Sequence, residues 1–331
     1  MLTSLRGIWV PLATPMHHGD IDFPVLQNLA DGLIAKGAHG LVVCGTTGEA
    51  SQLDLAEQGA ALAAVLEVAH KRCPVLMGIG GSDTFAAAGK ALQFDDTALA
   101  GYLVSTPAYV RPSQEGLVRH FEVIAEATAQ PIVLYNVPAR TGVNLELATA
   151  RRLSVNPQFV GIKEAAGSLA QMTELVRRTP LSVLCGDDAL LFAALCGGGH
   201  GAISAAAHIR VDLFVRLFDL VRAQRLTEAR ELFDQLLPIV RLLFSEPNPA
   251  PLKAALSMQG RAGEELRLPM TPASTECKLA IAAALEDLDR IPVYRCEAAV
   301  AAAPSSAGTM AAGAAGAAGA AGARVRAAEV I

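Results

Sequence analysis

The chain has 331 residues, of which 18% are charged and 52% hydrophobic, and its formal net charge is −5 at pH 7. This composition excludes a disordered chain and suffices for a large core. A slightly acidic chain without a run of Lys or Arg is not typical of nucleic-acid binding, so we expect no nucleic-acid partner. Residues 1–300 contain no uncharged apolar run of about 18 residues, and the first residues lack the layout of a signal peptide, so we expect no membrane partner and a cytoplasmic location.

Six cysteines are scattered singly along the chain. They form no CxxC pair, and no histidine lies at zinc-ligand spacing from any of them. We therefore expect small buried side chains in a reducing compartment and no metal site. The cysteines are Cys44, Cys73, Cys185, Cys196, Cys277 and Cys296.

Eight short apolar runs alternate with longer segments in which apolar residues recur three and four positions apart. Such runs are typical of parallel strands covered on both faces, and the intervening segments of amphipathic helices. The alternation predicts a (β/α)8 TIM barrel over residues 1–224. An open doubly wound sheet is the alternative, because the alternation of strands and helices does not show that the sheet closes into a barrel. No GxGxxG follows the first run, which argues against the dinucleotide-binding form of that open sheet. The runs are residues 7–14, 39–44, 75–79, 101–105, 132–135, 159–163, 182–185 and 201–204.

Beyond residue 224 the strand pattern stops. Residues 225–296 predict a three-helix region, with helices over 227–244, 249–258 and 271–288. Residues 297–331 consist largely of Ala, Gly and Ser, and a repeat with glycine at every third position packs poorly. We predict a disordered tail there.

Function in a parallel barrel lies at the carboxyl ends of the strands, and the sixth run ends in Lys163. Burial at such a place disfavours an ammonium and favours the neutral, nucleophilic amine, which attacks a ketone to form a Schiff base. The alternative is a structural ion pair between Lys163 and Glu164. The other lysines fall in helical or turn segments, where we expect solvated side chains: Lys36, Lys71, Lys90, Lys253 and Lys278.

Polar residues also follow the second and fifth runs. Thr46 and Thr47 stand between glycines in GTTGE and can hold a small carboxylate, or can simply cap a turn. Tyr135 ends the fifth run, where its hydroxyl can relay protons. Arg140 follows on a loop that contains proline and can bind a carboxylate with its planar fork. The alternative for this pair is a buried structural tyrosine and a solvated arginine.

Two further segments carry polar or aromatic side chains. Tyr109 lies between prolines in TPAYVRP, and an aromatic presented on a stiff loop indicates a ligand or subunit contact. For Asp187 and Asp188, which follow the seventh run, we favour helix capping over metal binding, because no histidine or third acidic residue stands nearby.

Together these motifs resemble the dihydrodipicolinate synthase/N-acetylneuraminate lyase superfamily. GTTGE, TPAYVRPSQEG, YNVPARTG, GIKEAAG, GDD and GGHGAIS occur here in the order and spacing of that family, over about residues 5–290. The resemblance implies a (β/α)8 barrel and a pyruvate-dependent lyase that uses a Schiff base. It is strongest to the branch that condenses pyruvate with aspartate semialdehyde in lysine biosynthesis.

The resemblance also implies roles for individual residues. Lys163 matches the Schiff-base lysine, Tyr135 the proton-shuttling tyrosine above it, and Thr46 the hydroxyl that links this tyrosine to a second one. Tyr109 matches that second tyrosine, which family members insert from a neighbouring subunit, so a homo-oligomer is implied, a dimer or a dimer of dimers. Thr47 matches the residue that holds the pyruvate carboxylate, Arg140 the residue that engages the aldehyde's carboxylate, and Gly186 and Ile203 residues that line the pyruvate pocket. No cofactor beyond the covalent imine is implied.

Two other readings stay open. Another Schiff-base aldolase of the superfamily would share Lys163 and Tyr135 but use Arg140 differently, and Ala108 stands where the family usually has a second aromatic residue beside Tyr109. A non-catalytic keto-acid sensor is the remaining alternative. Arg140 favours the synthase, because the sialic acid lyase branch usually lacks an arginine at this position.

Overall fold

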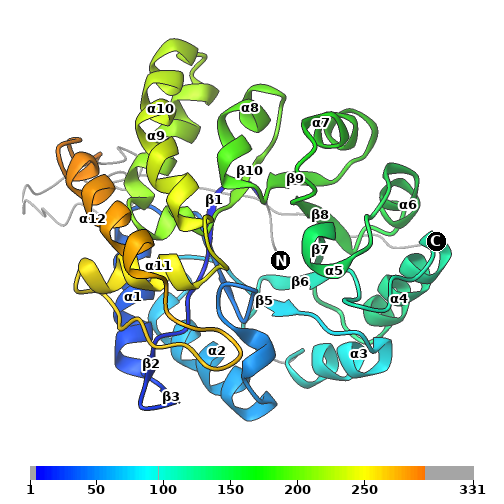
Figure 1. Ribbon diagram of the computed structural model, residues 1–331. Helices are drawn as coiled ribbons and strands as arrows, with labels where there is room; N and C mark the ends of the chain where they lie inside the picture. The colour runs from blue at the N-terminus through cyan, green and yellow to red at the C-terminus, as the bar shows by residue number, and fades with distance from the viewer. Residues whose placement is uncertain (1–4, 96, 295–331) are drawn as a thin grey trace, which may run out of the picture. The chain divides into compact units, whose positions relative to one another are not determined.

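Figure 1 shows the computed structural model of the chain, in which residues 5–95 and 97–294 are described. The predicted tail of residues 297–331 and Cys296 lie outside the described residues. The barrel and the helices that follow it belong to one compact unit.

Eight parallel strands form a closed barrel in the order β1-β10-β9-β8-β7-β6-β5-β4, because β1 pairs with both β10 and β4. This closure confirms the predicted barrel and excludes the open doubly wound sheet. The strands are β1 (Gly7–Pro11), β4 (Gly40–Val43), β5 (Val75–Ile79), β6 (Gly101–Ser105), β7 (Ile132–Asn136), β8 (Phe159–Glu164), β9 (Ser182–Cys185) and β10 (Gly201–Ile203).

Helices surround the barrel and alternate with its strands (Figure 1). They are α1 (Phe23–Ala35), α2 (Leu55–Ala69), α3 (Thr84–Gln93), α4 (Gln114–Glu126), α5 (Pro138–Thr141), α6 (Leu147–Leu153), α7 (Leu169–Arg178), α8 (Leu191–Cys196) and α9 (Val211–Arg222), with short 3-10 turns η1 (Ala50–Gln52), η2 (Asp188–Leu190) and η3 (Ala206–His208). A two-stranded hairpin, β2 (Met16–His17) and β3 (Asp20–Ile21), follows β1 and was not expected from the sequence.

Three helices follow the barrel, as the sequence predicts: α10 (Leu226–Leu243), α11 (Ala250–Met258) and α12 (Thr275–Asp289). α10 packs against α9 and α12, and α11 packs against α12. α12 begins four residues after the predicted start, because the side chain of Ser274 accepts a hydrogen bond from the amide of Cys277 and so caps the helix there. The division between a barrel ending at residue 224 and a separate helical region stays a prediction.

Apolar side chains fill two layers. Alternate strand residues point into the barrel and outward to the helices: Trp9 and Val42 belong to the inner cluster, whereas Ile8 and Leu41 belong to the outer one. The same period of two places Tyr135 in the inner cluster at the carboxyl end of β7. Strand geometry therefore directs polar side chains into the barrel at its functional end.

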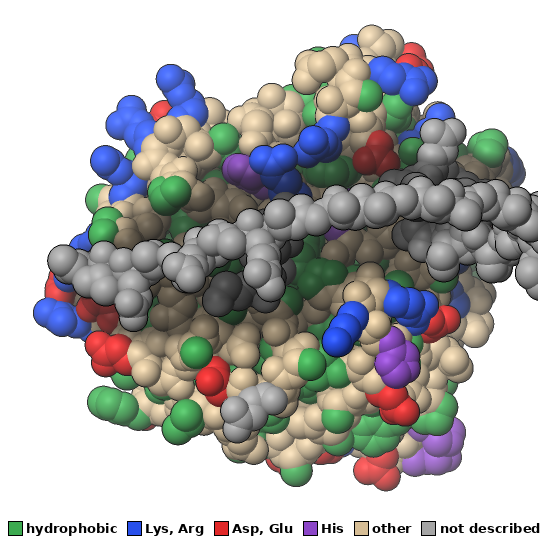
Figure 2. Space-filling model, turned by 180° about the vertical axis from the view of Figure 1, so that it is seen from behind, with side chains coloured by type: hydrophobic (Ala, Val, Ile, Leu, Met, Phe, Trp, Pro, Cys, Tyr) green, Lys and Arg blue, Asp and Glu red, His purple; other side chains and the backbone are tan. Residues whose placement is uncertain are grey.

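Side chains of both charge signs are interspersed on the face of the molecule shown in Figure 2, with hydrophobic side chains singly or in small groups between them. This pattern fits the nearly balanced counts of 27 basic and 32 acidic residues. Among the described residues, no helix is long and apolar enough to cross a membrane.

Candidate active site

Lys163 and Tyr135 lie side by side at the carboxyl ends of adjacent strands. They are direct partners in the pairing of β7 with β8, and the Lys163 Nζ lies 4.5 Å from the centre of the Tyr135 ring. Both are buried, at 7% and 8% exposure. The described residues offer no carboxylate within ion-pair distance of Nζ, so the alternative of a structural salt bridge to Glu164 is wrong.

The Glu164 side chain is directed away from Lys163 because successive strand residues point to opposite faces. Its carboxylate accepts hydrogen bonds from Asn136 Nδ2 at 3.0 Å and from Gln171 Nε2 at 3.1 Å, and it is fully buried. Burial raises the pKa of Glu164, while these two amides oppose the rise. The carboxylate therefore stabilises the β7–β8 edge and does not pair with the Lys163 amine.

Gly186 lets the lysine stem lie close to the backbone. A Cβ at this position would stand 2.9 Å from Lys163 Cε and 2.8 Å from Ala165 Cβ, closer than side chains pack. Ile203, on β10, is fully buried in the inner cluster with Tyr135. Both predicted pocket residues thus lie at the same end of the barrel as the lysine.

The two aspartates after β9 do not cap a helix through their side chains, so that expectation is wrong. Asp187 Oδ2 accepts from the Gly167 amide at 2.8 Å, and Asp188 Oδ2 accepts from the Ala206 amide at 3.1 Å. Asp187 thus holds the loop after β8, and Asp188 holds the first amide of η3, the 3-10 turn that follows β10. Burial raises the pKa of Asp188 to about 6, and the positive charge of Lys163 opposes this shift.

The threonine loop after β4 is held by a tight turn in which the Gly48 amide donates to the Gly45 carbonyl at 3.1 Å. Thr47 is 4% exposed, and its hydroxyl oxygen accepts from Asn248 Nδ2 at 3.1 Å. Thr46 is less buried and lines the cavity described below. The loop therefore presents the two hydroxyls in different surroundings.

The C-terminal region anchors this loop from behind. Lys253 of α11 forms an ion pair with Glu49, and both side chains are 1% exposed. The expectation of a solvated Lys253 is therefore wrong: its helix packs over the loop, so the ammonium is enclosed. The backbone amide of Arg267 donates to Glu49 Oε2 at 3.2 Å.

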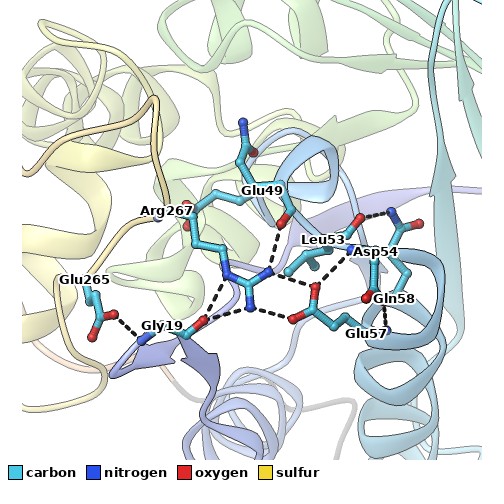
Figure 3. A network of polar contacts seen from close by, with 9 residues as sticks. Gly19, Glu49, Leu53, Asp54, Glu57, Gln58, Glu265 and Arg267 are labelled. Atoms are coloured by element: carbon cyan, nitrogen blue, oxygen red, sulfur yellow. Dashed lines mark hydrogen bonds and ion pairs between the residues drawn. The ribbon is translucent and has the colours of Figure 1, made fainter.

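Arg267 connects three segments, as Figure 3 shows. Its guanidinium donates to the Gln52 carbonyl at 2.8 Å, to the Gly19 carbonyl of the hairpin at 2.7 Å, and to Glu57 at 2.8 Å. Hydrogen bonding to Arg267 lowers the pKa of Glu57 to about 2. Neither Arg267 nor Lys253 could have been assigned by sequence motif, because their partners come from distant segments.

A cavity of about 390 Å³ opens at this end of the barrel. Thr46, Tyr135 and Arg140 line it together. Lys163 and Thr47 lie near these residues but are not among those that line the cavity. Tyr109 is 90% exposed, has a φ of +72°, and does not line the cavity either. The structure thus places Tyr109 outward, as predicted, and apart from the other site residues.

Arg140 lies on the short helix α5 directly after Tyr135 and Asn136 of β7. Its backbone amide donates to the Val137 carbonyl at 2.9 Å, which fixes the turn. The guanidinium is exposed and forms no ion pair within the described part of the chain. It is therefore available to an anionic ligand. No group of three or more His, Cys, Asp or Glu residues that could hold a metal occurs among the described residues.

The fold and this arrangement are those of a parallel-barrel protein with a buried lysine, a tyrosine and a loop with two threonines at the carboxyl ends of its strands. Residues 4–288 match the Dihydrodipicolinate synthetase family, and the chain belongs to that family.

Individual relatives agree with this assignment over most of their length. The 4-hydroxy-tetrahydrodipicolinate synthase of Geobacter metallireducens is 40% identical over 288 residues, which are 86% of this chain and 99% of the relative. That of Syntrophobacter fumaroxidans is 41% identical over 277 residues, 83% of this chain and 95% of the relative. The crystal structure of dihydrodipicolinate synthase from Thermotoga maritima is 35% identical, with a TM-score of 0.84 over 85% of this chain and 98% of that one.

Proposed function

We propose that this chain is a pyruvate-dependent Schiff-base lyase that condenses pyruvate with aspartate semialdehyde to 4-hydroxy-tetrahydrodipicolinate, in lysine and diaminopimelate biosynthesis. The observation that carries the proposal is the buried Lys163 amine beneath the Tyr135 ring, with Glu164 turned away from it. The family and the names of the relatives support the same activity.

In the proposed reaction, the Lys163 amine attacks the ketone of pyruvate, and loss of water gives an imine. The protonated imine withdraws electrons from the neighbouring methyl carbon, which loses a proton and becomes an enamine. The enamine carbon then attacks the aldehyde carbon, and the aldehyde oxygen takes up a proton to become the hydroxyl. The amino group of the aldehyde substrate displaces Lys163 from the imine carbon, which closes the ring and frees the lysine amine. Tyr135, whose ring lies over the amine, moves protons in these steps, and Thr46 and Tyr109 complete the relay.

Two carboxylates must be held during this chemistry. We assign the pyruvate carboxylate to the Thr47 loop and the aldehyde's carboxylate to Arg140. The Arg140 guanidinium forms no ion pair among the described residues, so it can make a bidentate contact with this carboxylate. Gly186 and Ile203 complete the pyruvate pocket. Asn248 acts through Thr47 as a positioning residue, because it donates to the Thr47 hydroxyl.

The imine supplies the electron sink, so we propose a reaction without a metal or organic cofactor. We further propose a homo-oligomer, a dimer or a dimer of dimers, in which the exposed Tyr109 completes a neighbour's site. A cytoplasmic location stays a prediction.

The test is a substrate panel combined with covalent trapping. Purified protein should consume pyruvate fastest with aspartate semialdehyde among several aldehydes, compared by kcat/KM. Borohydride added with pyruvate should attach one reduced pyruvate to the peptide that contains Lys163. A label on a different lysine would refute the site, and a preference for another aldehyde would assign the chain to another aldolase branch.

The matched control is Lys163→Arg. A guanidinium remains protonated and cannot attack the ketone, so trapping should be abolished while the fold is kept. Pyruvate binding without turnover of any aldehyde would support the sensor alternative instead.

A further inference from the structure

A second cavity, of about 640 Å³, is formed where α1, α11 and α12 lie on one side of the barrel (Figure 1). It shares no lining residue with the cavity that contains Tyr135 and Arg140. Its volume is in the range of sites for small organic ligands. The cavity is therefore a separate candidate site. Its apolar lining residues are Ile209, Met258, Ala282, Leu285, Ile291 and Val293.

Lys36, which follows the last residue of α1, brings a positive charge to this cavity. The sequence predicts solvated side chains for both Lys36 and Lys90. Lys36 is exposed, whereas Lys90 donates to the Gly78 carbonyl at 3.2 Å and burial lowers its pKa, so the prediction is wrong for Lys90. The described residues place no carboxylate oxygen within 4.0 Å of the Lys36 ammonium. Partial burial lowers the pKa of Lys36, and the strongest effect of another charge comes from Arg261, which lowers it further.

Arg261, which follows α11, lines the same cavity and is held by one end of its guanidinium. Its Nη1 donates to the carbonyl of His208 and, at 3.3 Å, to Gln259 Oε1. Within residues 5–95 and 97–294, its Nε and Nη2 have no hydrogen-bond partner, and no carboxylate oxygen lies within 4.0 Å. Burial lowers the pKa of Arg261, because the charge is partly withdrawn from water. The other edge of this anchored guanidinium is therefore free for a ligand.

The remaining charged residues of the cavity do not neutralise these two cations. Arg210 binds Asp212 through Nε at 2.9 Å and through Nη2 at 2.8 Å, so these two charges offset each other. Glu286 and Asp289 of α12 also line the cavity, but both are exposed to water. Neither has a carboxylate oxygen within 4.0 Å of Lys36 or Arg261. Two like charges thus share one cavity, an arrangement that an anion between them would stabilise.

We propose that this cavity binds a phosphate monoester with an apolar body. Two phosphate oxygens accept from Nε and Nη2 of Arg261, and the third accepts from the Lys36 ammonium. A carboxylate fits less well, because the guanidinium occupies both of its oxygens. The two negative charges of the phosphate match the two cations, and the apolar body packs against Met258 and Leu285. This site is additional to the proposed reaction and does not depend on it.

Calorimetry on the full chain tests the site with phenyl phosphate, inorganic phosphate and benzyl alcohol. At pH 8 both phosphates carry nearly two negative charges, because their second pKa is about 6. Phenyl phosphate should bind more tightly than inorganic phosphate, because its ring contacts the apolar wall, and benzyl alcohol should not bind measurably. Arg261→Met should weaken the binding of phenyl phosphate at least about tenfold, the scale expected for losing a charged hydrogen-bond partner. Lys36→Met should weaken it by a smaller factor, because Lys36 is more exposed.

Two variants control for charge and for location. Lys71→Met removes an exposed lysine that does not line the cavity and should leave the binding unchanged. Arg140→Ala removes the free guanidinium of the other cavity, and phenyl phosphate should still bind. Loss of binding in Arg140→Ala would place the ligand at the candidate active site and overturn the proposal.

Equal binding by Arg261→Met and the wild type would also overturn it, as would the absence of any binding of phenyl phosphate. Arg261 also holds the His208 carbonyl, so Arg261→Met could fail to fold. In that case, an equal affinity of Lys36→Met and the wild type for phenyl phosphate refutes the site. None of these titrations measures turnover, so their outcome is independent of the activity assay.

Discussion

Lys253 and Glu49 form an ion pair in which each side chain is only 1% exposed. Lys253 also donates to the Glu265 carbonyl at 2.7 Å, and Glu49 directly follows the Thr46–Thr47–Gly48 turn with a φ of +53°. Glu49 is thus held in a left-handed conformation by a partner from α11. The C-terminal helices thereby fix the loop to which we assign the pyruvate carboxylate.

We predict that Lys253→Met destabilises the protein by about 3–5 kcal/mol, because Glu49 is left as an uncompensated buried charge. Urea unfolding measures the loss. The double variant Lys253→Met/Glu49→Gln should recover part of the stability. If the loop positions pyruvate, the KM for pyruvate rises more than kcat falls.

The exposed pair Arg290–Asp287, with side chains 74% exposed, provides the control. Arg290→Met should leave stability and the KM for pyruvate near the wild-type values, because exposed ion pairs contribute little. Equal effects of the two substitutions would contradict the anchoring role of Lys253.

Tyr135→Phe should keep the fold and lower kcat by roughly 10²–10⁴, the usual scale for a general acid–base group. The ring still packs in the inner cluster, so only the hydroxyl is lost. Steady-state kinetics with a circular dichroism check measures this. An unchanged kcat would make Tyr135 a core residue and the proposed proton relay wrong.

Arg140→Ala should impair the aldehyde step and spare imine formation. The guanidinium lines the cavity but is exposed, so its removal costs little stability. The measurement compares kcat/KM for aspartate semialdehyde with the yield of borohydride-trapped pyruvate. A similar loss in both would mean that Arg140 serves pyruvate as well.

Mixing two inactive variants tests whether Tyr109 completes a neighbour's site. Lys163→Ala and Tyr109→Phe subunits are combined under conditions that permit exchange, and activity should partly return. Each mixed dimer then holds one site with both the lysine and the tyrosine intact. A fully active monomer in sedimentation would end this idea.

His208 should make the protein less stable as the pH falls. It is fully buried, its Nε2 accepts from the Ala13 amide at 3.1 Å, and burial lowers its pKa from 6.5 to about 3. Between these two values the unfolded chain binds a proton that the native protein does not, so stability rises with pH by about 1.4 kcal/mol per unit for this group.

His208→Gln should reduce the slope of stability against pH by up to about 1.4 kcal/mol per pH unit. Glutamine does not titrate, but its side-chain oxygen can accept the same hydrogen bond from the Ala13 amide. Urea unfolding at several pH values between 4 and 6.5 provides the slopes. The comparison uses slopes and not absolute stability, so a general destabilisation by the substitution does not obscure it. An identical slope in the variant would refute the role of His208.

Much of the barrel could be predicted because its signals are local. Apolar runs of strand length predicted the eight strands. In seven of them both ends lie within one residue of the predicted bounds, and the first strand ends three residues before its predicted end. The fifth run placed Tyr135 at the end of a strand, and the structure shows that its side chain belongs to the inner cluster. The expectation that chemistry lies at the carboxyl ends of parallel strands then selected Lys163 as the reactive amine.

Partners from distant segments could not be predicted in this way. Asn248 and Thr47 are 201 positions apart, and no periodicity links them. For Lys253 and Lys90 we expected solvated side chains on helices. The sequence pattern indicates the position of a residue in its own helix, but not which other segments pack over that residue.

By itself, the sequence determined the order of strands and helices and which residues stand at the ends of the strands, since both follow from short-range backbone geometry. Only the tertiary structure decided the closure of the barrel, the Lys253–Glu49 pair and the enclosure of Lys90. The physical reason is that desolvation and charge pairing depend on which surfaces meet in space. The free energy of a buried ammonium depends on the groups that lie near it in space. The residues next to Lys90 or Lys253 in the sequence do not indicate which groups these are.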